Sequence, residues 1–321
     1  MVLKGPAGSH TSATTRSALV DKKILAKLSH WRTSTVSGYP RKAMVDLHTH
    51  SQASDGSDPP ARIPQLAATA GCSAVALTDH DTLDGLAQAR EAAQSCGVEL
   101  ISGCEISCEW KQGSMHVLVY FVDPGEGPLQ DELAQLRLDR DRRNQALIGR
   151  LQALGLPISY TDVMEEAGGG LVGRPHFAAA LVRSGVVGSI KDAFDLYLAK
   201  GRPGYVSKAR LSPAKVASLA TASGGVAVLA HPLSLGASDA ELDQVIAELA
   251  ASGISGLEAI YGRYSPAERA ALAALARRHD LAVTGGSDYH GTFKPDLSVG
   301  VGTGDLEVPD SALDEIASRR P

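Results

Sequence analysis

From Met44 onward, short runs rich in strand-forming residues alternate with longer Ala- and Leu-rich amphipathic stretches. This alternation is typical of repeated βα units around a parallel sheet. The predicted strands lie near 44–48, 73–78, 98–103, 115–121, 225–230, 255–260 and 281–286. The sequence therefore predicts an α/β fold, and several strands end in polar residues, where an α/β barrel places its chemistry.

Helical patterns accompany these strands near 60–70, 84–96, 213–223, 239–252 and 265–279. The interval 122–210 breaks the rhythm because its helical patterns, near 129–154, 160–167, 175–184 and 189–199, follow one another without a strand. We expect residues 44–121 and 211–321 to form a barrel and residues 122–210 to form a helical insertion over its mouth. The run Gly168-Gly169-Gly170 fits neither a Walker A motif nor GxGxxG, so we interpret it as a flexible linker.

Residues 1–43 form a basic leader, with eight Lys or Arg and a single acidic residue, Asp21. Ser, Thr and Gly are scattered among the basic residues, so we expect the leader to be disordered and the folded domain to begin at Met44. An arm that binds nucleic acid is the alternative interpretation.

The chain as a whole has an ordinary globular composition, with 44% hydrophobic and 21% charged residues and a formal net charge of -5. This mild charge disfavours a general nucleic-acid or membrane surface, and we expect no membrane association and no stable protein partner. The sequence lacks a signal-peptide pattern and CxxC spacing, which indicates a reduced, cytoplasmic protein. We interpret Cys104 and Cys108 as small buried residues rather than metal ligands.

The first candidate site motif is Asp46-Leu47-His48-Thr49-His50-Ser51, at the end of the first predicted strand. Alternation along a strand places Asp46, His48 and His50 on one face, so both imidazoles point toward one position. Ordinary core or surface histidines seldom occur as HxH directly after an acid, and metal ligation is therefore the preferred interpretation.

Two further strands lead into acidic residues and histidines. Asp79, His80 and Asp81 follow an apolar strand, and three ionisable residues in a row pack poorly in a core. Asp81 or Thr82 is suited to capping the next helix, whereas His80 has no comparable structural role. Glu105 lies just beyond the apolar run 98–102.

Three later strands continue the pattern. His116 begins the alternating run 115–121, His231 ends one apolar strand, and Asp288 with His290 ends another. Six of the ten histidines occupy such positions, namely His48, His50, His80, His116, His231 and His290. Imidazole and carboxylate ligands together suit Mn, Fe or Zn, and carboxylates can bridge two ions.

The ordered motifs DLHTHS, SDG, TDHD, GCEIS, a strand His, AHP and GSDYH resemble the PHP (polymerase and histidinol phosphatase) family over nearly all of residues 46–291. The resemblance implies a distorted (β/α)7 barrel whose C-terminal mouth holds two to three divalent ions and hydrolyses phosphate esters. Manganese is the preferred ion, with Fe, Zn or Mg as alternatives.

The resemblance also implies a ligand set. One ion would be bound by His48, His50, Glu105 and Asp288, a second by Glu105, His116 and His231, and a third by Asp55, His80 and His290. Some relatives have a histidine at the position of Asp55, which leaves the metal preference of the third site open. We expect Asp46 and Asp79 to orient histidines through their free ring nitrogens.

Within the family, the chain most resembles the cytoplasmic RNase AM branch, which removes the 3'-phosphate from nucleoside 3',5'-bisphosphates and trims short RNA from the 5' end. The long insertion favours this branch. Arg174 and His176 lie two residues apart at a predicted helix start, and with Lys208 we expect them to bind a substrate phosphate. The alternative is a surface position for Arg174 and a helix-start role for His176.

The predicted function is a metal-dependent phosphoesterase that acts on nucleotides or short RNA. Its catalytic group is a metal-activated water, and no protein side chain is assigned as general acid. One alternative keeps the chemistry and changes the substrate to histidinol phosphate, another small phosphate ester or DNA ends. A non-catalytic metal-binding module is disfavoured, because the chain retains all nine implied ligands.

Overall fold

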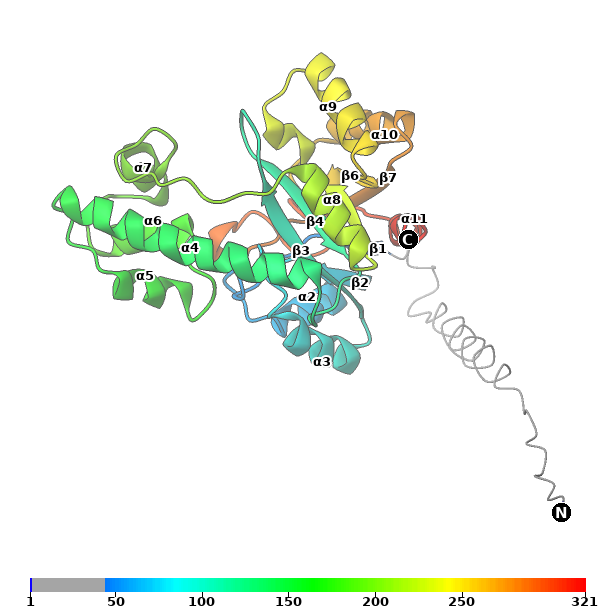
Figure 1. Cartoon of the computed structure of the whole chain (residues 1–321), viewed down its shortest axis with the longest axis horizontal. Helices are drawn as coiled ribbons and strands as arrows, with labels where there is room; N and C mark the ends of the chain where they lie inside the picture. Colours follow the sequence, from blue (N-terminus) through cyan, green and yellow to red (C-terminus); the bar gives the residue numbers. More distant parts are fainter. Residues whose placement is uncertain (2–43) are drawn as a thin grey trace. The chain divides into compact units, whose positions relative to one another are not determined.

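The computed structural model describes Met1 and residues 44–321. The predicted leader disorder falls on residues 2–43, outside the described residues. One seven-stranded sheet has its strands in chain order, and it curves into a nearly closed barrel (Figure 1). Its strands are β1 (Met44–Asp46), β2 (Cys72–Leu77), β3 (Glu99–Cys108), β4 (Met115–Tyr120), β5 (Val226–Leu229), β6 (Gly256–Tyr261) and β7 (Ala282–Gly286). The α/β prediction and all seven strand positions are confirmed.

The fourth strand corrects the expectation of a wholly parallel sheet. β4 pairs antiparallel with both β3 and β5, while all other neighbours are parallel. The cause is the short connection 109–114, because parallel neighbours need a crossover of a dozen or more residues. β3 also runs on to Cys108, so Glu105 lies inside a strand rather than beyond one. The reversed direction places the start of β4 at the mouth.

The sheet closes through the segments that follow β1 and β7. The N–H of Leu47 donates to Gly285 O (3.1 Å), that of Asp288 to His48 O (2.8 Å) and that of His50 to Tyr289 O (2.9 Å). These bonds hold the DLHTHS and GSDYH segments side by side. The first and last motifs of the chain therefore meet at one point of the mouth.

Helices surround this sheet. The barrel helices are α2 (Arg62–Ala70), α3 (Leu86–Cys96), α8 (Pro213–Ala222), α9 (Asp239–Ala251), α10 (Pro266–Arg278) and α11 (Ser311–Ala317), the last of which the sequence pattern did not predict. α2 and α3 end at Gly71 and Gly97 in the left-handed conformation (φ 84° and 72°), which glycine adopts without a Cβ clash. Short 3-10 turns follow β5 (Pro232–Leu235) and β7 (Gly291–Phe293).

Two apolar clusters pack against the two faces of the sheet. Side chains that face inward from the strands, including Leu47, Leu118 and Tyr120, pack with Ile316 of α11. Side chains on the outer face of the sheet, such as Leu77, pack against the surrounding helices. Burial of both faces explains why the strands read as nearly continuous apolar runs.

The insertion is helical, as the sequence predicts. Its helices are α4 (Pro128–Ala153), α5 (Tyr160–Ala167), α6 (Arg174–Arg183) and α7 (Ile190–Ala193), the last continued by a π-helical turn (Phe194–Leu198). In Figure 1, α4 runs from the barrel helices to α5, α6 and α7. Leu133 and Leu136 of α4 belong to the barrel core, whereas Leu147 and Leu151 belong to a separate insertion core. One helix therefore connects the two cores.

The glycine run between α5 and α6 is not a flexible linker. Gly168 ends α5 in the left-handed conformation (φ 58°). A Cβ on Gly170 would lie 1.7 Å from the carbonyl oxygen of Gln52, and the N–H of Leu171 donates to Ala53 O (3.4 Å). The run therefore caps a helix and packs against the loop that follows β1.

No helix in the described part of the chain is both long and apolar enough to cross a bilayer.

Candidate metal centre

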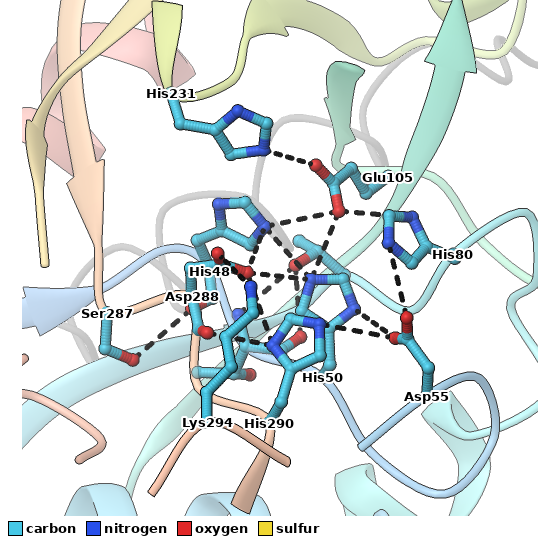
Figure 2. A network of polar contacts seen from close by, with 12 residues as sticks. His48, His50, Asp55, His80, Glu105, His231, Ser287, Asp288, His290 and Lys294 are labelled. Atoms are coloured by element: carbon cyan, nitrogen blue, oxygen red, sulfur yellow. Dashed lines mark hydrogen bonds and ion pairs between the residues drawn. The ribbon is translucent and has the colours of Figure 1, made fainter. Parts of the chain in front are cut away.

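The mouth of the barrel brings together all nine side chains that the sequence predicts as ligands. Figure 2 shows the imidazoles of His48, His50, His80 and His290 turned toward the carboxylates of Glu105, Asp55 and Asp288. These residues come from the ends of β1, β2 and β7 and from β3. The remaining predicted ligands, His116 at the start of β4 and His231 after β5, lie on the other side of Glu105.

Glu105 is the centre of this group, and its carboxylate is buried. One oxygen, Oε1, lies 2.9 Å from Nδ1 of His116 and 3.0 Å from Nε2 of His231. The other, Oε2, lies 3.4 Å from Nε2 of His48, 3.2 Å from Nε2 of His50 and 3.2 Å from Nδ1 of His80. One carboxylate therefore faces five imidazoles, two through one oxygen and three through the other.

The other two carboxylates flank this centre. Asp55 Oδ1 lies 3.3 Å from Nε2 of His290, and Asp55 Oδ2 lies 3.7 Å from Nε2 of His80. Asp288 Oδ1 lies 3.4 Å from both Nε2 of His48 and Nε2 of His50. Asp288 Oδ2 accepts hydrogen bonds from Tyr261 Oη (2.7 Å) and from Lys294.

Backbone geometry at the strand ends orients these side chains toward one another. The ladder between β2 and β3 continues past Leu77, because the N–H of Glu105 donates to Asp79 O and the N–H of Asp81 donates to Glu105 O. Asp81, His231 and Asp288 all have positive φ angles (54°, 25° and 55°), which non-glycine residues rarely adopt. Such strained conformations cluster at functional sites, where the surrounding structure holds them.

The electrostatics of the cluster call for positive charge. Burial lowers the pKa of His50, but hydrogen bonds to Asp288 and Glu105 outweigh burial and raise it to about 9. Burial raises the pKa of Glu105, yet the surrounding imidazoles, His80 first, hold it well below its usual range. Burial dominates at His80 itself and lowers its pKa to about 3. The buried carboxylates of Glu105, Asp55 and Asp288 are therefore ionised beside positive charge, which protonated imidazoles or bound metal ions can supply.

The donor set fits divalent metal ions. Nδ1 of His50 and of His80 are buried and form no hydrogen bond, although carboxylate oxygens lie 3.7 Å and 3.2 Å away. Unpaired ring nitrogens that face carboxylates are the arrangement that bound ions require. Three groups have ligand atoms within 4.8 Å of one another, namely His50 with Asp55, His80 and His290; His48 with His50 and Glu105; and His80 with Glu105 and His116.

Glu258 of β6 has the role that was predicted for Asp46 and Asp79, because it contacts a ring nitrogen of a candidate metal ligand. Its Oε1 lies 2.8 Å from Nδ1 of His48, and its Oε2 accepts the N–H of His231 (2.7 Å). Sequence reasoning missed this residue, although it is the only charged residue in the buried strand Gly256–Tyr261. A single acidic residue within an apolar strand was the sequence feature that could have identified it.

The expected role of Asp46 and Asp79 is wrong. Asp46 accepts backbone N–H groups from His48 (3.2 Å), Ser287 (2.9 Å) and Gly300 (2.7 Å). Asp79 accepts from the backbone of Ser51 (2.8 Å) and from the hydroxyls of Ser51 and Ser54 (2.6 Å each). Both carboxylates therefore accept hydrogen bonds from the loops that carry the histidines, and not from the histidine rings.

The three predicted substrate contacts lie in or beside the insertion. The Arg174 guanidinium, at the start of α6, lies 5.6 Å from the Tyr205 ring centroid. Nδ1 of His176 accepts the N–H of Gly173 (3.0 Å), which caps the helix start as the alternative interpretation holds. Lys208 Nζ donates to Asp81 Oδ2 at 2.5 Å.

The mouth also opens into a cavity of ≈ 490 Å³ lined by residues of the candidate metal centre and by Tyr261, Arg263, Tyr264 and Lys294.

Comparisons with known proteins agree with this geometry. The PHP domain family model matches residues 46–167. The chain is 33% identical over 259 residues to the 3',5'-nucleoside bisphosphate phosphatase of Chromobacterium violaceum, covering 80% of this chain and 91% of that relative. It is 36% identical over 249 residues to the 5'-3' exoribonuclease Rnm of Escherichia coli, covering 77% and 85% of the two chains.

A solved structure from Bifidobacterium adolescentis, assigned as a metal-dependent phosphoesterase, has the same fold. It superposes with a TM-score of 0.76 at 33% sequence identity, covering 88% of this chain and 98% of that one. The similarity therefore extends through both the barrel and the insertion.

Proposed function

Because this chain belongs to the PHP domain family and is a metal-dependent phosphoesterase, we propose that it removes the 3'-phosphate from nucleoside 3',5'-bisphosphates and degrades short RNA from the 5' end. The observation that carries the proposal is the convergence of five imidazoles on the buried Glu105 carboxylate. Such a site suits the hydrolysis of an anionic ester, in which developing negative charge must be stabilised.

The two substrates share one reacting bond. Removal of a 3'-phosphate breaks the bond between phosphorus and the 3'-oxygen, and release of the first nucleotide from the 5' end of RNA breaks the same bond. In both reactions the product is a nucleoside 5'-phosphate with a free 3'-hydroxyl. A single active site can therefore serve both, provided that it recognises the 5'-phosphate.

The chain's own residues would prepare the site for this reaction. The nine residues of the mouth would bind two to three divalent ions, with Mn preferred over Fe, Zn or Mg: His48, His50, Asp55, His80, Glu105, His116, His231, Asp288 and His290. Divalent ions, when bound, activate water and neutralise charge on the phosphate. Glu258 keeps the His48 ring in place, and Tyr261 with Lys294 keeps Asp288 in place.

The insertion would add substrate recognition. Residues 44–121 and 211–321 would supply the barrel, and residues 122–210 would cover one side of the mouth, where Arg174, His176 and Lys208 would bind the substrate. The packing of Gly170 against Gln52 supports this arrangement. A cytoplasmic location is consistent with four cysteines that form no disulfide.

A panel of substrates and metals tests the proposal. Metal-stripped protein should regain activity with Mn and should hydrolyse adenosine 3',5'-bisphosphate well above histidinol phosphate. Short RNA with a 5'-phosphate should be degraded faster than the same RNA with a 5'-hydroxyl. Faster hydrolysis of histidinol phosphate, or no activity with any ion, would contradict the proposal.

A further inference from the structure

The cavity at the mouth extends past the candidate metal centre. One of its walls consists of predicted metal ligands, and the other comes from the segments that follow β5 and β6. We call this second wall the outer wall, and its side chains are Leu233, Tyr261, Arg263 and Tyr264. All lining residues belong to the barrel, whereas the insertion packs against the segments that follow β1 and β2. The cavity and the insertion therefore lie on different sides of the mouth.

The outer wall has a fixed apolar part. Leu233 is 37% exposed, and its backbone N–H donates to Oη of Tyr264 (2.9 Å). The Tyr264 ring also packs against the Tyr261 ring, with 4.7 Å between their centroids. An aromatic and an aliphatic side chain are therefore held next to each other. Such a surface suits a planar nucleobase, which stacks on apolar side chains with little dependence on base identity.

A cation lies at the rim of the same wall. Nε and Nη2 of Arg263 donate to the two carboxylate oxygens of Asp296 (2.9 and 2.7 Å), and the Arg263 side chain remains 42% exposed. In the part of the chain that the structure describes, Nη1 of Arg263 has no hydrogen-bond partner. One edge of a positioned guanidinium is thus left for a phosphate oxygen. The nearby Glu268 is already used, because it accepts the N–H and the hydroxyl of Ser265.

The two proposed substrates differ at the reacting phosphate. The 3'-phosphate of a bisphosphate ends in terminal oxygens, whereas the same phosphate in RNA carries the next nucleoside through its 5'-oxygen. Hydrolysis transfers the hydroxyl of water to phosphorus and breaks the bond to the 3'-oxygen, which takes up a proton. The shortened RNA keeps the phosphate and becomes 5'-phosphorylated. Only RNA therefore extends beyond the reacting phosphate.

The cavity has room for that extension. The first nucleotide would be held on the side of the insertion, so the rest of the RNA must leave the metal centre on another side. The volume of ≈ 490 Å³ lies within the range of about 300–1,000 Å³ that is typical of small-ligand sites. A phosphate monoester by itself does not need this space.

We propose that the cavity binds the second nucleotide of an RNA substrate, with its base against Leu233 and Tyr264 and its own 3'-phosphate at Arg263. The inference deepens the proposed function, on which it rests, because it assigns a place to the part of RNA that a bisphosphate lacks. The subsite would therefore affect the hydrolysis of RNA and not that of bisphosphates.

Kinetics with a graded series of substrates test the inference. The series contains adenosine 3',5'-bisphosphate, its methyl ester at the 3'-phosphate, and the 5'-phosphorylated forms of ApA and ApApA. The wild type should have a higher kcat/KM for the dinucleotide than for the methyl ester, because only the dinucleotide places a nucleoside in the cavity. Leu233→Ala should lower kcat/KM for the dinucleotide by about 3- to 10-fold through the lost apolar contact. Its kcat/KM for the bisphosphate and the methyl ester should fall much less.

Arg263→Gln tests the rim of the cavity. Only the trinucleotide has a phosphate after its second nucleoside, so the variant should lower kcat/KM for ApApA more than for ApA. Loss of one phosphate contact should also reduce the slope of log kcat/KM against log salt concentration by about 0.7. Arg278→Gln is the matched control, because Arg278 at the last turn of α10 pairs with the exposed Asp243 (2.8 Å). Leu138→Ala, at a leucine that is 53% exposed, is the control for Leu233→Ala. Both controls should behave like the wild type.

Binding measured without hydrolysis separates this inference from the proposed function. In calorimetry with the metal-stripped full chain, Leu233→Ala should bind 5'-phosphorylated ApA more weakly than the wild type and adenosine 3',5'-bisphosphate equally well. Equal wild-type kcat/KM for the methyl ester and the dinucleotide, or equal losses of Leu233→Ala on the dinucleotide and the bisphosphate, would overturn the subsite alone. Leu233-dependent binding of the dinucleotide, without hydrolysis of any substrate under any metal, would overturn the proposed function alone.

Discussion

The carboxylate of Glu258 lies 2.8 Å from Nδ1 of His48, and both side chains are fully buried. Since Glu258 also accepts the N–H of His231, one acid of β6 orients two predicted ligands. Glu258→Gln should therefore lower metal affinity by about 10- to 100-fold, the usual effect of losing a residue that orients a ligand. Titration of the metal-stripped variant with Mn measures this change.

Glu91→Gln is the control for that substitution, because Glu91 is an exposed acid on α3. It should leave both metal affinity and melting temperature unchanged. Unchanged affinity in Glu258→Gln would show that the neutral amide orients His48 equally well.

Replacement of Glu105 should harm turnover more than replacement of any other predicted ligand. Glu105→Gln loses the negative charge that faces five imidazoles, and a neutral amide cannot balance two cations across one bridge. We expect kcat to fall by more than about 100-fold, beyond the range for residues that only orient ligands. Steady-state kinetics, metal analysis and circular dichroism should be combined. Near-normal turnover with full metal content would contradict the bridging role.

Arg174→Ala separates recognition by the insertion from chemistry at the barrel. Loss of a charge-assisted contact should lower kcat/KM for adenosine 3',5'-bisphosphate by roughly 10- to 100-fold. The small ester p-nitrophenyl phosphate has no second phosphate, so its kcat/KM should fall much less, with metal content unchanged. Equal losses on both esters would instead place Arg174 at the reacting phosphate. No loss on either would leave Arg174 as a residue that only packs against the Phe194 and Tyr205 rings.

Two glycine substitutions should act in opposite directions. Gly170→Ala would place a Cβ 1.7 Å from the Gln52 carbonyl oxygen, so it should push the insertion away from the loop after β1 and lower both stability and bisphosphate hydrolysis. Gly149→Ala, at an exposed position inside α4 with open space around it, should stabilise the protein by about 0.5–1 kcal/mol. Urea unfolding compares the two variants. A Gly170→Ala protein as stable and active as the wild type would show that this contact does not position the insertion.

The sequence by itself determined the barrel and most of the candidate site. Several apolar runs end in ionisable residues, because a barrel buries the middle of its strands and exposes the carboxyl ends at one mouth. His116 is informative in this respect. Its place at the start of a run, together with the short connection before it, was a signal that β4 runs antiparallel.

Only the tertiary structure decided which side chains meet. Glu258 looked like one acid within a strand until the barrel placed it against His48 from the other end of the chain. Arg140 and Arg143 continue the spacing of Leu136 and Leu147 on the apolar face of α4, but local sequence does not show what that face packs against. The physical reason is that spacing along a strand or helix specifies a face, whereas the partners of that face depend on long-range packing.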